Sequence, residues 1–296
     1  METFNFSVPQ DITVGKGSLS KLPEIAKKLG GKHALIISGP HLEKMGLVKK
    51  VSDYLASADI KADTFTDIEA NPSVTTVEKA TAKYLESGAD FIVAFGGGSP
   101  MDVAKAVGVV AKYGGSVTDY EGAHKVPGPI VPLIAIPTTA GTGSEVTAFS
   151  VITDYAKGIK YPLADFNITP DVAIVDPALA ATMPKKLTAH TGMDAMTHAI
   201  EAYVSTLHCD YTDPLALHAI KMIHTYLVKS YNGDKEARAR MHNAQCLAGM
   251  AFSNALLGIV HSMAHKTGAA YSGGHIVHGC ANAMYLPKVI KYNAKE

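Results

Sequence analysis

The stretch Asp90–Asp102, DFIVAFGGGSPMD, indicates the fold class of the first half of this chain. An apolar run that stops at glycines is typical of a strand buried on both faces of a sheet. The residues after the glycines favour a helix start, with Ser99 as N-cap, Pro100 at the first helical position and Asp102 complementing the helix dipole. We therefore predict a buried strand, a tight turn and then a helix.

The same alternation extends toward the N-terminus. HALIISG, from His33 to Gly39, reads as a short buried strand that ends in a turn. A helical pattern follows at residues 46–57, a strand at 62–65 and a second helix at 77–87. Strands that alternate with helices indicate a parallel sheet with helices on both faces. The first half is therefore expected to be an α/β domain built on a parallel sheet.

The character of the sequence changes past about Leu179. Long helical patterns then follow one another, beginning with MPKKLTAHTGMDAMTHAIEAYV and continuing through DPLALHAIKMIHTYLVKSY. We predict a boundary in the segment 176–183, with an α/β domain over residues 1–179 and an all-α domain over 180–296.

Composition excludes several classes of function. The chain has 27 basic and 27 acidic residues, so no net field attracts nucleic acid or an anionic membrane. Three widely spaced cysteines argue against a disulfide framework and for a reducing compartment. No signal peptide is recognisable at the N-terminus, and no apolar run approaches the ~20 residues that span a bilayer. A soluble, cytoplasmic protein is expected.

Three stretches of the second half carry candidate metal ligands. Asp194 and His198 are four residues apart, as are His261 and His265, and His278 follows in GGHIVHGCANA. Residues four apart share one face of a helix, so each pair can point at one spot. Imidazole and carboxylate ligands suit a divalent ion such as Fe(II), Zn(II) or Ni(II). One histidine alone is more often an ordinary helix-face residue, but such a polar cluster is costly to bury without a shared partner.

These motifs, GMDAMTHAIEAY, HSMAH and HGCANA, resemble the metal-binding signature of the iron-containing (group III) alcohol dehydrogenases. The resemblance begins at about Phe6 and implies a dehydroquinate synthase-like architecture. It also implies Asp194, His198, His261 and His278 as ligands of Fe(II), with Zn(II) as the alternative metal. His265 is then a catalytic histidine that relays a proton, or else a hydrogen-bond partner of a ligand. The loop that holds His275 is longer than in many members, and we favour His278 because it begins the HG-x-AN motif.

The same resemblance places the coenzyme in the first domain. A glycine triplet alone can be a plain turn, but GGGSPMD is similar to the family's pyrophosphate loop, and PTTAGTGSEVT to its second polar loop. If the two halves face each other across a cleft, the coenzyme meets the metal there. For Lys160 a solvated surface position is the alternative. The residues implied in coenzyme binding are Ser38, Gly39, Asn71, Gly97, Gly98, Ser99, Thr138, Thr139, Thr147 and Lys160.

Gly39 bears on which coenzyme is used. Many NAD-linked members of the family carry an aspartate at this turn, and its carboxylate bonds the ribose 2′-hydroxyl and repels a 2′-phosphate. The small, neutral Ser38–Gly39–Pro40 leaves room for the phosphate. We predict a preference for NADP(H) over NAD(H), unless Gly39 is only a turn glycine.

The expected activity is metal-dependent hydride transfer between NAD(P)H and a small alcohol or aldehyde. A glycerol dehydrogenase- or dehydroquinate synthase-like enzyme is the alternative on the same fold. Side chains near the metal motifs, such as Ala195 and Ala264, favour a short uncharged alcohol. Family members continue with several more helices past the last motif, so this chain is either truncated or a naturally short member. A homo-oligomer that associates through exposed apolar faces is expected. The non-enzymatic alternative is a truncated chain that binds nucleotide without full activity.

Overall fold

The chain divides into two units, which are described separately. The computed structural model describes residues 3–270 and 276–294. The α/β unit comprises Pro9–Thr138 and Ser144–Asp176. The helical unit comprises Met1–Val8, Thr139–Gly143 and Pro177–Glu296.

A six-stranded sheet is the frame of the α/β unit. Its order is β1-β9-β6-β4-β2-β3, and every neighbouring pair is parallel. The chain winds outward from β2 to β3 and returns to β4 on the other side of β2, so its direction reverses between β2 and β4. The predicted parallel α/β fold is confirmed. The strands are β1 (Asp11–Val14), β2 (His33–Ser38), β3 (Lys61–Phe65), β4 (Phe91–Gly96), β6 (Leu133–Pro137) and β9 (Val172–Val175).

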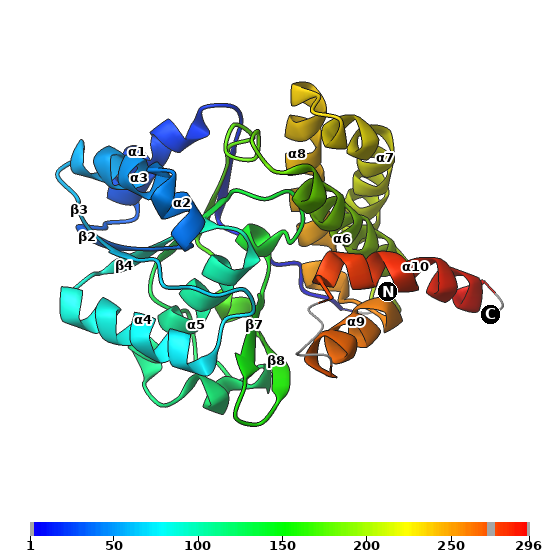
Figure 1. Cartoon of the computed structure of the whole chain (residues 1–296). Coiled ribbons are helices and arrows are strands. Elements are labelled where there is room, and N and C mark those ends of the chain that lie inside the picture. Colours follow the sequence, from blue (N-terminus) through cyan, green and yellow to red (C-terminus); the bar gives the residue numbers. More distant parts are fainter. Residues whose placement is uncertain (1–2, 271–275, 295–296) are drawn as a thin grey trace. The chain divides into compact units, whose positions relative to one another are not determined.

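Helices cover both faces of this sheet, with α4 and α5 on one face and α1 and α3 on the other (Figure 1). Alternate strand residues such as Leu35 and Ile92 pack with Val77 and Val103 of α4 and α5 in one buried cluster. Because side chains alternate along a strand, β2 and β4 are buried on both faces and read as continuous apolar runs. The helices are α1 (Leu22–Lys28), α2 (Pro40–Lys44), α3 (Leu47–Ala56), α4 (Val74–Ser87) and α5 (Gly98–Tyr113).

A small second sheet and short 3₁₀ turns complete the α/β unit. The sheet has the order β5-β8-β7, with β7 and β8 antiparallel and β5 parallel to β8. Its strands are β5 (Gly122–Ala123), β7 (Phe149–Asp154) and β8 (Ile159–Ala164). The 3₁₀ turns are η1 (Ser18–Lys21), η2 (Val117–Tyr120), η3 (Ser144–Val146) and η4 (Phe166–Ile168).

Alanine-rich faces pack the helices of the second unit. Ala195 and Ala199 of α6 meet Ala219 of α7 and Ala244 of α8 in one buried cluster, and such small side chains let helices approach closely. A second cluster joins Val260 of α9 to Leu286 and Val289 of α10. The predicted all-α second half is confirmed. The helices are α6 (Lys185–Tyr203), α7 (Thr212–Tyr231), α8 (Lys235–Ala255), α9 (Ile259–Ala270) and α10 (His278–Asn293).

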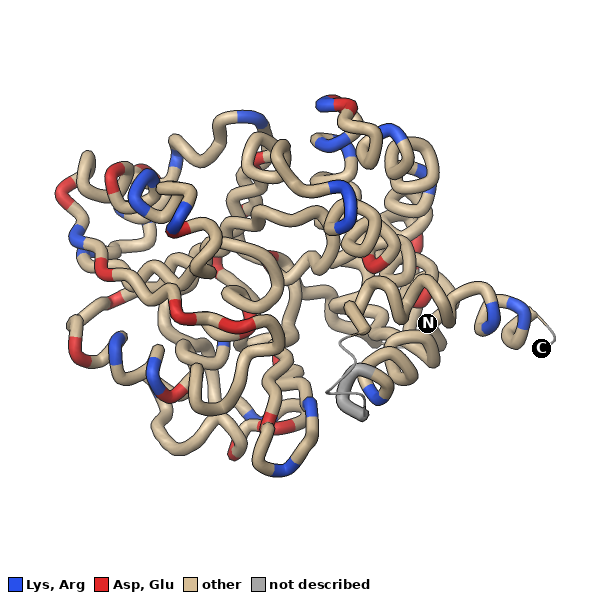
Figure 2. Tube along the Cα trace, viewed as in Figure 1, with Lys and Arg blue, Asp and Glu red and all other residues tan. Residues whose placement is uncertain are grey.

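The described surface carries charges of both signs and also exposes apolar side chains such as Val204, Tyr211 and Val228. Figure 2 shows basic and acidic residues interspersed along both units. Among the described helices, none is by itself both long and apolar enough to cross a membrane. Helix α8 and the segment Ile259–Thr267 pass the length and composition test only as a pair, with a 100° bend between them.

One lysine in α5 is fully buried, and the sequence patterns do not reveal it. Lys105 is 0 % exposed, and its Nζ lies 2.8 Å from the carbonyl oxygens of Thr147 and Phe149. The hydroxyl oxygens of Ser144 and Thr147 lie 3.2 Å away. Burial lowers the pKa of Lys105, while the carboxylates of Asp102 and Glu145 oppose this shift. The lysine thereby ties α5 to residues 144–149.

We expect Lys105→Met to destabilise the chain strongly. Methionine keeps most of the volume but leaves buried oxygens and nearby carboxylates without their cation, which lowers the free energy of unfolding by roughly 3–5 kcal/mol. Urea denaturation followed by circular dichroism measures the change. Lys112→Met is the matched control on the same helix, because Lys112 bonds Pro129 at an exposed position, and it should change stability by less than about 1 kcal/mol. Equal small effects of both variants would contradict the expectation.

Candidate metal centre

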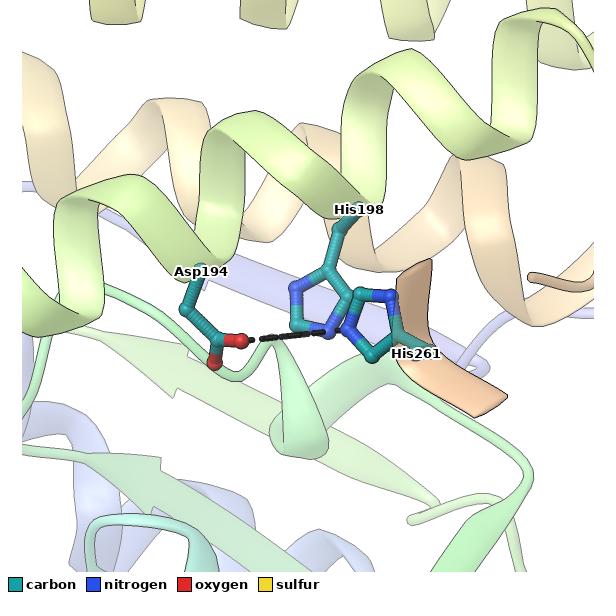
Figure 3. A group of neighbouring side chains, drawn as sticks. All are labelled: Asp194, His198 and His261. Atoms are coloured by element: carbon teal, nitrogen blue, oxygen red, sulfur yellow. Dashed lines mark ion pairs between the residues drawn. The ribbon is translucent and has the colours of Figure 1, made fainter. Parts of the chain in front are cut away.

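A carboxylate and two imidazoles meet in the interior of the helical unit. Asp194 and His198 lie one turn apart on α6, and His261 lies in the first turn of α9. Figure 3 shows the three side chains gathered together. Oδ1 of Asp194 is 3.9 Å from Nε2 of His198 and 3.8 Å from Nε2 of His261. All three residues are buried, so the polar atoms face one another rather than water.

Two further histidines border this group. His278 is the first residue of α10, and its Nε2 lies 3.4 Å from Oδ1 of Asp194. The ring of His265, one turn beyond His261, lies 4.9 Å from the ring of His278. The five residues predicted for this site are therefore neighbours. His275 lies outside the described residues, so the choice of His278 over it stays a prediction.

The surroundings of the group favour an ionised Asp194 and a neutral His198, whereas they favour the protonated form of His261. Burial acts to raise the pKa of Asp194, but the adjacent imidazoles of His198, His278 and His261 outweigh it and hold the pKa well below its usual range. Burial lowers the pKa of His198 to about 4. Burial acts the same way on His261, but bonds to Asp194 and Glu201 outweigh it and raise its pKa. Neutral imidazole and ionised carboxylate are the protonation states that bind metals.

The donor set and its spacing fit a divalent metal ion. Ligands at about 2.0–2.2 Å from a tetrahedral ion lie about 3.3–3.6 Å from one another. The distances from Oδ1 of Asp194 to the three imidazoles are 3.4, 3.8 and 3.9 Å. In addition, Nδ2 of Asn282 lies 2.7 Å from Oδ1 of Asp194, 3.1 Å from Nε2 of His261 and 3.3 Å from Nε2 of His278. Acceptor atoms from three elements thus already converge on one electropositive group.

Three residues around the cluster were not predicted from the sequence. Oε2 of Glu201 lies 2.5 Å from Nδ1 of His261, Nδ2 of Asn282 lies 2.7 Å from Oδ1 of Asp194, and Phe252 stacks on His198 with ring centroids 4.3 Å apart. Glu201 follows Asp194 by seven residues, two helical turns along the same face, which is a signal that the sequence contains. Asn282 and Phe252 carry no comparable spacing signal.

Five of the predicted coenzyme residues lie at the carboxyl ends of central strands of the α/β unit. Ser38 and Gly39 lie at the end of β2, Gly97 and Gly98 follow β4, and Thr138 follows β6. These ends share one edge of the sheet because the strands are parallel, and the winding reverses between β2 and β4. Dinucleotides bind at this point in open α/β sheets.

The predicted N-cap of α5 is wrong. The helix begins at Gly98 with Gly97 as its N-cap, so Ser99 already lies within the first turn. Gly97 has no side chain that could cap the helix. The backbone N–H groups of the first turn therefore receive no hydrogen bond acceptor from the N-cap side chain. Gly96 has a φ of +155°, a value that glycine adopts easily. The chain therefore turns at Gly96, and the helix begins before it reaches Ser99.

The other predicted coenzyme residues lie in different parts of the fold and have different hydrogen-bond partners. Nζ of Lys160 donates to Oδ1 of Asn71 at 2.8 Å, and this bond links β8 to the loop before α4. Thr147 is a partner of the buried Lys105. Thr139 belongs to the helical unit, whereas Thr138 beside it belongs to the α/β unit.

Comparison with known proteins identifies the family. Residues 9–177 match the family described as iron-containing alcohol dehydrogenase, and residues 188–296 match the C-terminal part of the Fe-containing alcohol dehydrogenase family. The chain belongs to the iron-containing alcohol dehydrogenases. The fold class and the NAD(P)-dependent alcohol dehydrogenase activity expected from the sequence are therefore confirmed.

Relatives and solved structures of the iron-containing alcohol dehydrogenases match almost the whole chain. It is 58 % identical over 294 residues to an NADPH-dependent butanol dehydrogenase of Clostridium saccharobutylicum, covering 98 % of this chain and 74 % of the relative. It is 42 % identical to an NAD-dependent methanol dehydrogenase of Bacillus methanolicus, covering 98 % and 76 %. The structure of a 1,3-propanediol oxidoreductase superposes with a TM-score of 0.95 at 40 % identity, over 99 % of this chain and 76 % of that one.

Gly279 gives the cluster a testable dependence on helix packing. A Cβ atom at this position of α10 would lie 2.0 Å from the carbonyl oxygen of His190 in α6. We expect Gly279→Ala to push α10 away from α6, to lower stability by roughly 1–3 kcal/mol and to displace His278.

Thermal unfolding and iron content after dialysis measure both effects of Gly279→Ala. Met284→Ala is the control, because Met284 lies on the same helix and is 58 % exposed, and it should change stability by less than about 1 kcal/mol. Unchanged stability and iron content in Gly279→Ala would contradict a tight contact between α6 and α10.

Proposed function

We propose that this chain is an iron-dependent dehydrogenase of short, uncharged primary alcohols that prefers NADP(H). The buried Asp194–His198–His261 group, with His278 beside it, carries the proposal. Carboxylate and imidazole ligands hold Fe(II) and Zn(II) alike, and no cysteine contributes a thiolate to the described metal-binding group that would favour zinc. Fe(II) is proposed from the family, with Zn(II) as the alternative. The named relative that is 58 % identical is a butanol dehydrogenase, which supports the substrate class.

In this proposal Asp194, His198, His261 and His278 hold the ion and direct their ligand atoms at one point. A divalent metal ion there would lower the pKa of a substrate hydroxyl and polarise an aldehyde carbonyl. The nicotinamide coenzyme would exchange the hydride with the substrate carbon. His265, whose ring lies 4.9 Å from that of His278, would pass the hydroxyl proton toward water.

Ala195 does not bear on the size of the substrate. Its place beside the metal motif favoured a short alcohol, but its side chain packs in the alanine-rich cluster with Ala219 and Ala244. The small size of Ala195 therefore serves the contact between α6 and its neighbouring helices. Support for a short alcohol rests on Ala264, which is buried next to His265, and on the butanol dehydrogenase relative.

The coenzyme preference is proposed from the turn after β2. A Cβ atom at Gly39 would have no heavy atom within 4 Å, and the φ of Gly39 is an ordinary extended −92°, so larger residues fit there. The butanol dehydrogenase relative is NADPH-dependent, and the methanol dehydrogenase relative is NAD-dependent. Binding of the coenzyme by Ser38, Gly39, Asn71, Gly97, Gly98, Ser99, Thr138, Thr139, Thr147 and Lys160 stays part of this proposal.

Three expectations from the sequence also stay proposals. They are the division into residues 1–179 and 180–296, a homo-oligomeric state and a cytoplasmic location. Size-exclusion chromatography with light scattering tests the oligomer directly.

For the metal site, we expect His278→Ala to lose iron during dialysis and to lose butanal-dependent oxidation of NADPH. Removing a ligand should weaken metal binding by more than the roughly 10–100-fold that loss of an outer hydrogen-bond partner costs. Elemental analysis and absorbance of NADPH measure the two effects. His224→Ala is the control, since His224 lies exposed on α7. Full iron retention by His278→Ala, or iron loss by His275→Ala instead, would contradict the assignment.

For the coenzyme, we expect wild-type kcat/KM with butanal to be higher for NADPH than for NADH. Gly39→Asp should reverse the preference, because the new carboxylate repels the 2′-phosphate and accepts a bond from the ribose hydroxyl. Gly39→Asn has the same shape without the charge and should keep most of the preference for NADPH. A wild type that works better with NADH would show that Gly39 does not decide the preference.

A further inference from the structure

Glu201 is a buried carboxylate that the chemistry described so far does not use. It lies on α6, two turns after Asp194, and is 4 % exposed. A carboxylate in the interior needs strong hydrogen-bond donors to be tolerated. The donors that Glu201 finds belong to a different helix, α9, which carries His261.

Three nitrogen atoms from the start of α9, two of the backbone and one of the His261 ring, lie close to this carboxylate. The backbone N–H of Val260 donates to Oε1 at 2.7 Å, and the backbone N–H of His261 donates to Oε2 at 3.3 Å. Nδ1 of the His261 ring lies 2.5 Å from the same Oε2. Glu201 therefore satisfies backbone groups that the first turn of a helix leaves unpaired, and it also contacts the side chain of a predicted metal ligand.

The direction of the bond to the ring follows from these contacts. Backbone N–H groups can only donate, so both oxygens of Glu201 already act as acceptors, and an ionised carboxylate has no proton to give. The proton between Glu201 and His261 is then carried by Nδ1. A neutral imidazole with its proton on Nδ1 has a free electron pair on Nε2. That Nε2 atom is the one that lies 3.8 Å from Oδ1 of Asp194.

We propose that Glu201 is a positioning residue of the metal centre, which holds His261 as the Nδ1–H tautomer and fixes its ring so that Nε2 is available as a ligand. The inference rests on the proposed metal site and goes beyond it, because it assigns a separate task to a residue that does not touch the metal. Carboxylate partners of this kind orient ligand histidines and raise their basicity.

Glu201→Gln separates this role from a purely structural one. Glutamine has the same shape and can still accept the backbone bond from Val260 through its carbonyl oxygen. Its amide group then faces Nδ1 of His261 as a donor, which favours the opposite tautomer with the proton on Nε2. We expect the variant to fold with somewhat lower thermal stability, because the backbone N–H of His261 loses the acceptor Oε2. We expect it to bind Co(II) about 10–100-fold more weakly, with an altered visible spectrum.

The measurement uses the full chain, freed of metal and titrated with Co(II) under visible absorption. The ¹⁵N chemical shifts of His261, at a pH where its ring is neutral, report the tautomer in the wild type and in Glu201→Gln. Glu236→Gln is the matched control, because the Glu236 side chain is 76 % exposed at the start of α8, and it should leave Co(II) binding and the spectrum unchanged.

Several outcomes would overturn the proposal. An Nε2–H tautomer of His261 in the wild type would do so without any variant. Wild-type Co(II) affinity in Glu201→Gln would show that Glu201 only caps α9, and the metal site would stand. Weaker Co(II) binding with an unchanged tautomer would point to general distortion instead. If the wild type itself bound no Co(II), the proposed metal site would fail and the role of Glu201 with it.

Discussion

The carboxylate of Asp194 is removed from water almost completely, and in the described residues its ion-pair partners are histidines alone. An anion in such a place is stable only where positive or proton-bearing groups surround it. Imidazoles and the amide of Asn282 meet that need in part, and a divalent cation would meet it in full. The helical unit is organised around this requirement, because the compensating groups come from α6, α9 and α10.

Bringing three helices so close demands small residues between them. Alanines fill the faces that α6 shares with α7 and α8, and Gly279 lets α10 approach the backbone of α6. The alanines let α6 pack closely on α7 and α8, which carry none of the residues of the metal group. A bulkier residue at Gly279 would instead move α10, which carries His278, away from α6.

Sequence spacing predicted the parts of the site that depend on a single helix. Asp194 and His198 share a face because they are four residues apart, and DFIVAF predicted a strand buried on both sides. Features that depend on contacts between different elements could be predicted less well from the sequence. A lysine within a helix suggests an exposed position, yet Lys105 is buried by a loop some 40 residues away in the chain. Ser99 is a good N-cap by local preference, but the turn at Gly96 starts the helix earlier.

The burial of Lys105 also constrains how this enzyme can be recombined with its relatives. The oxygens that bond its ammonium belong to residues 144–149, and the lysine itself belongs to α5. The two segments therefore have to be exchanged together, although they are separated in the chain. A chimera that takes residues 144–149 from one parent and α5 from another keeps this contact only if both parents have it. Crossover points between residues 105 and 144 should therefore be chosen only between parents that share the buried lysine and its oxygen partners.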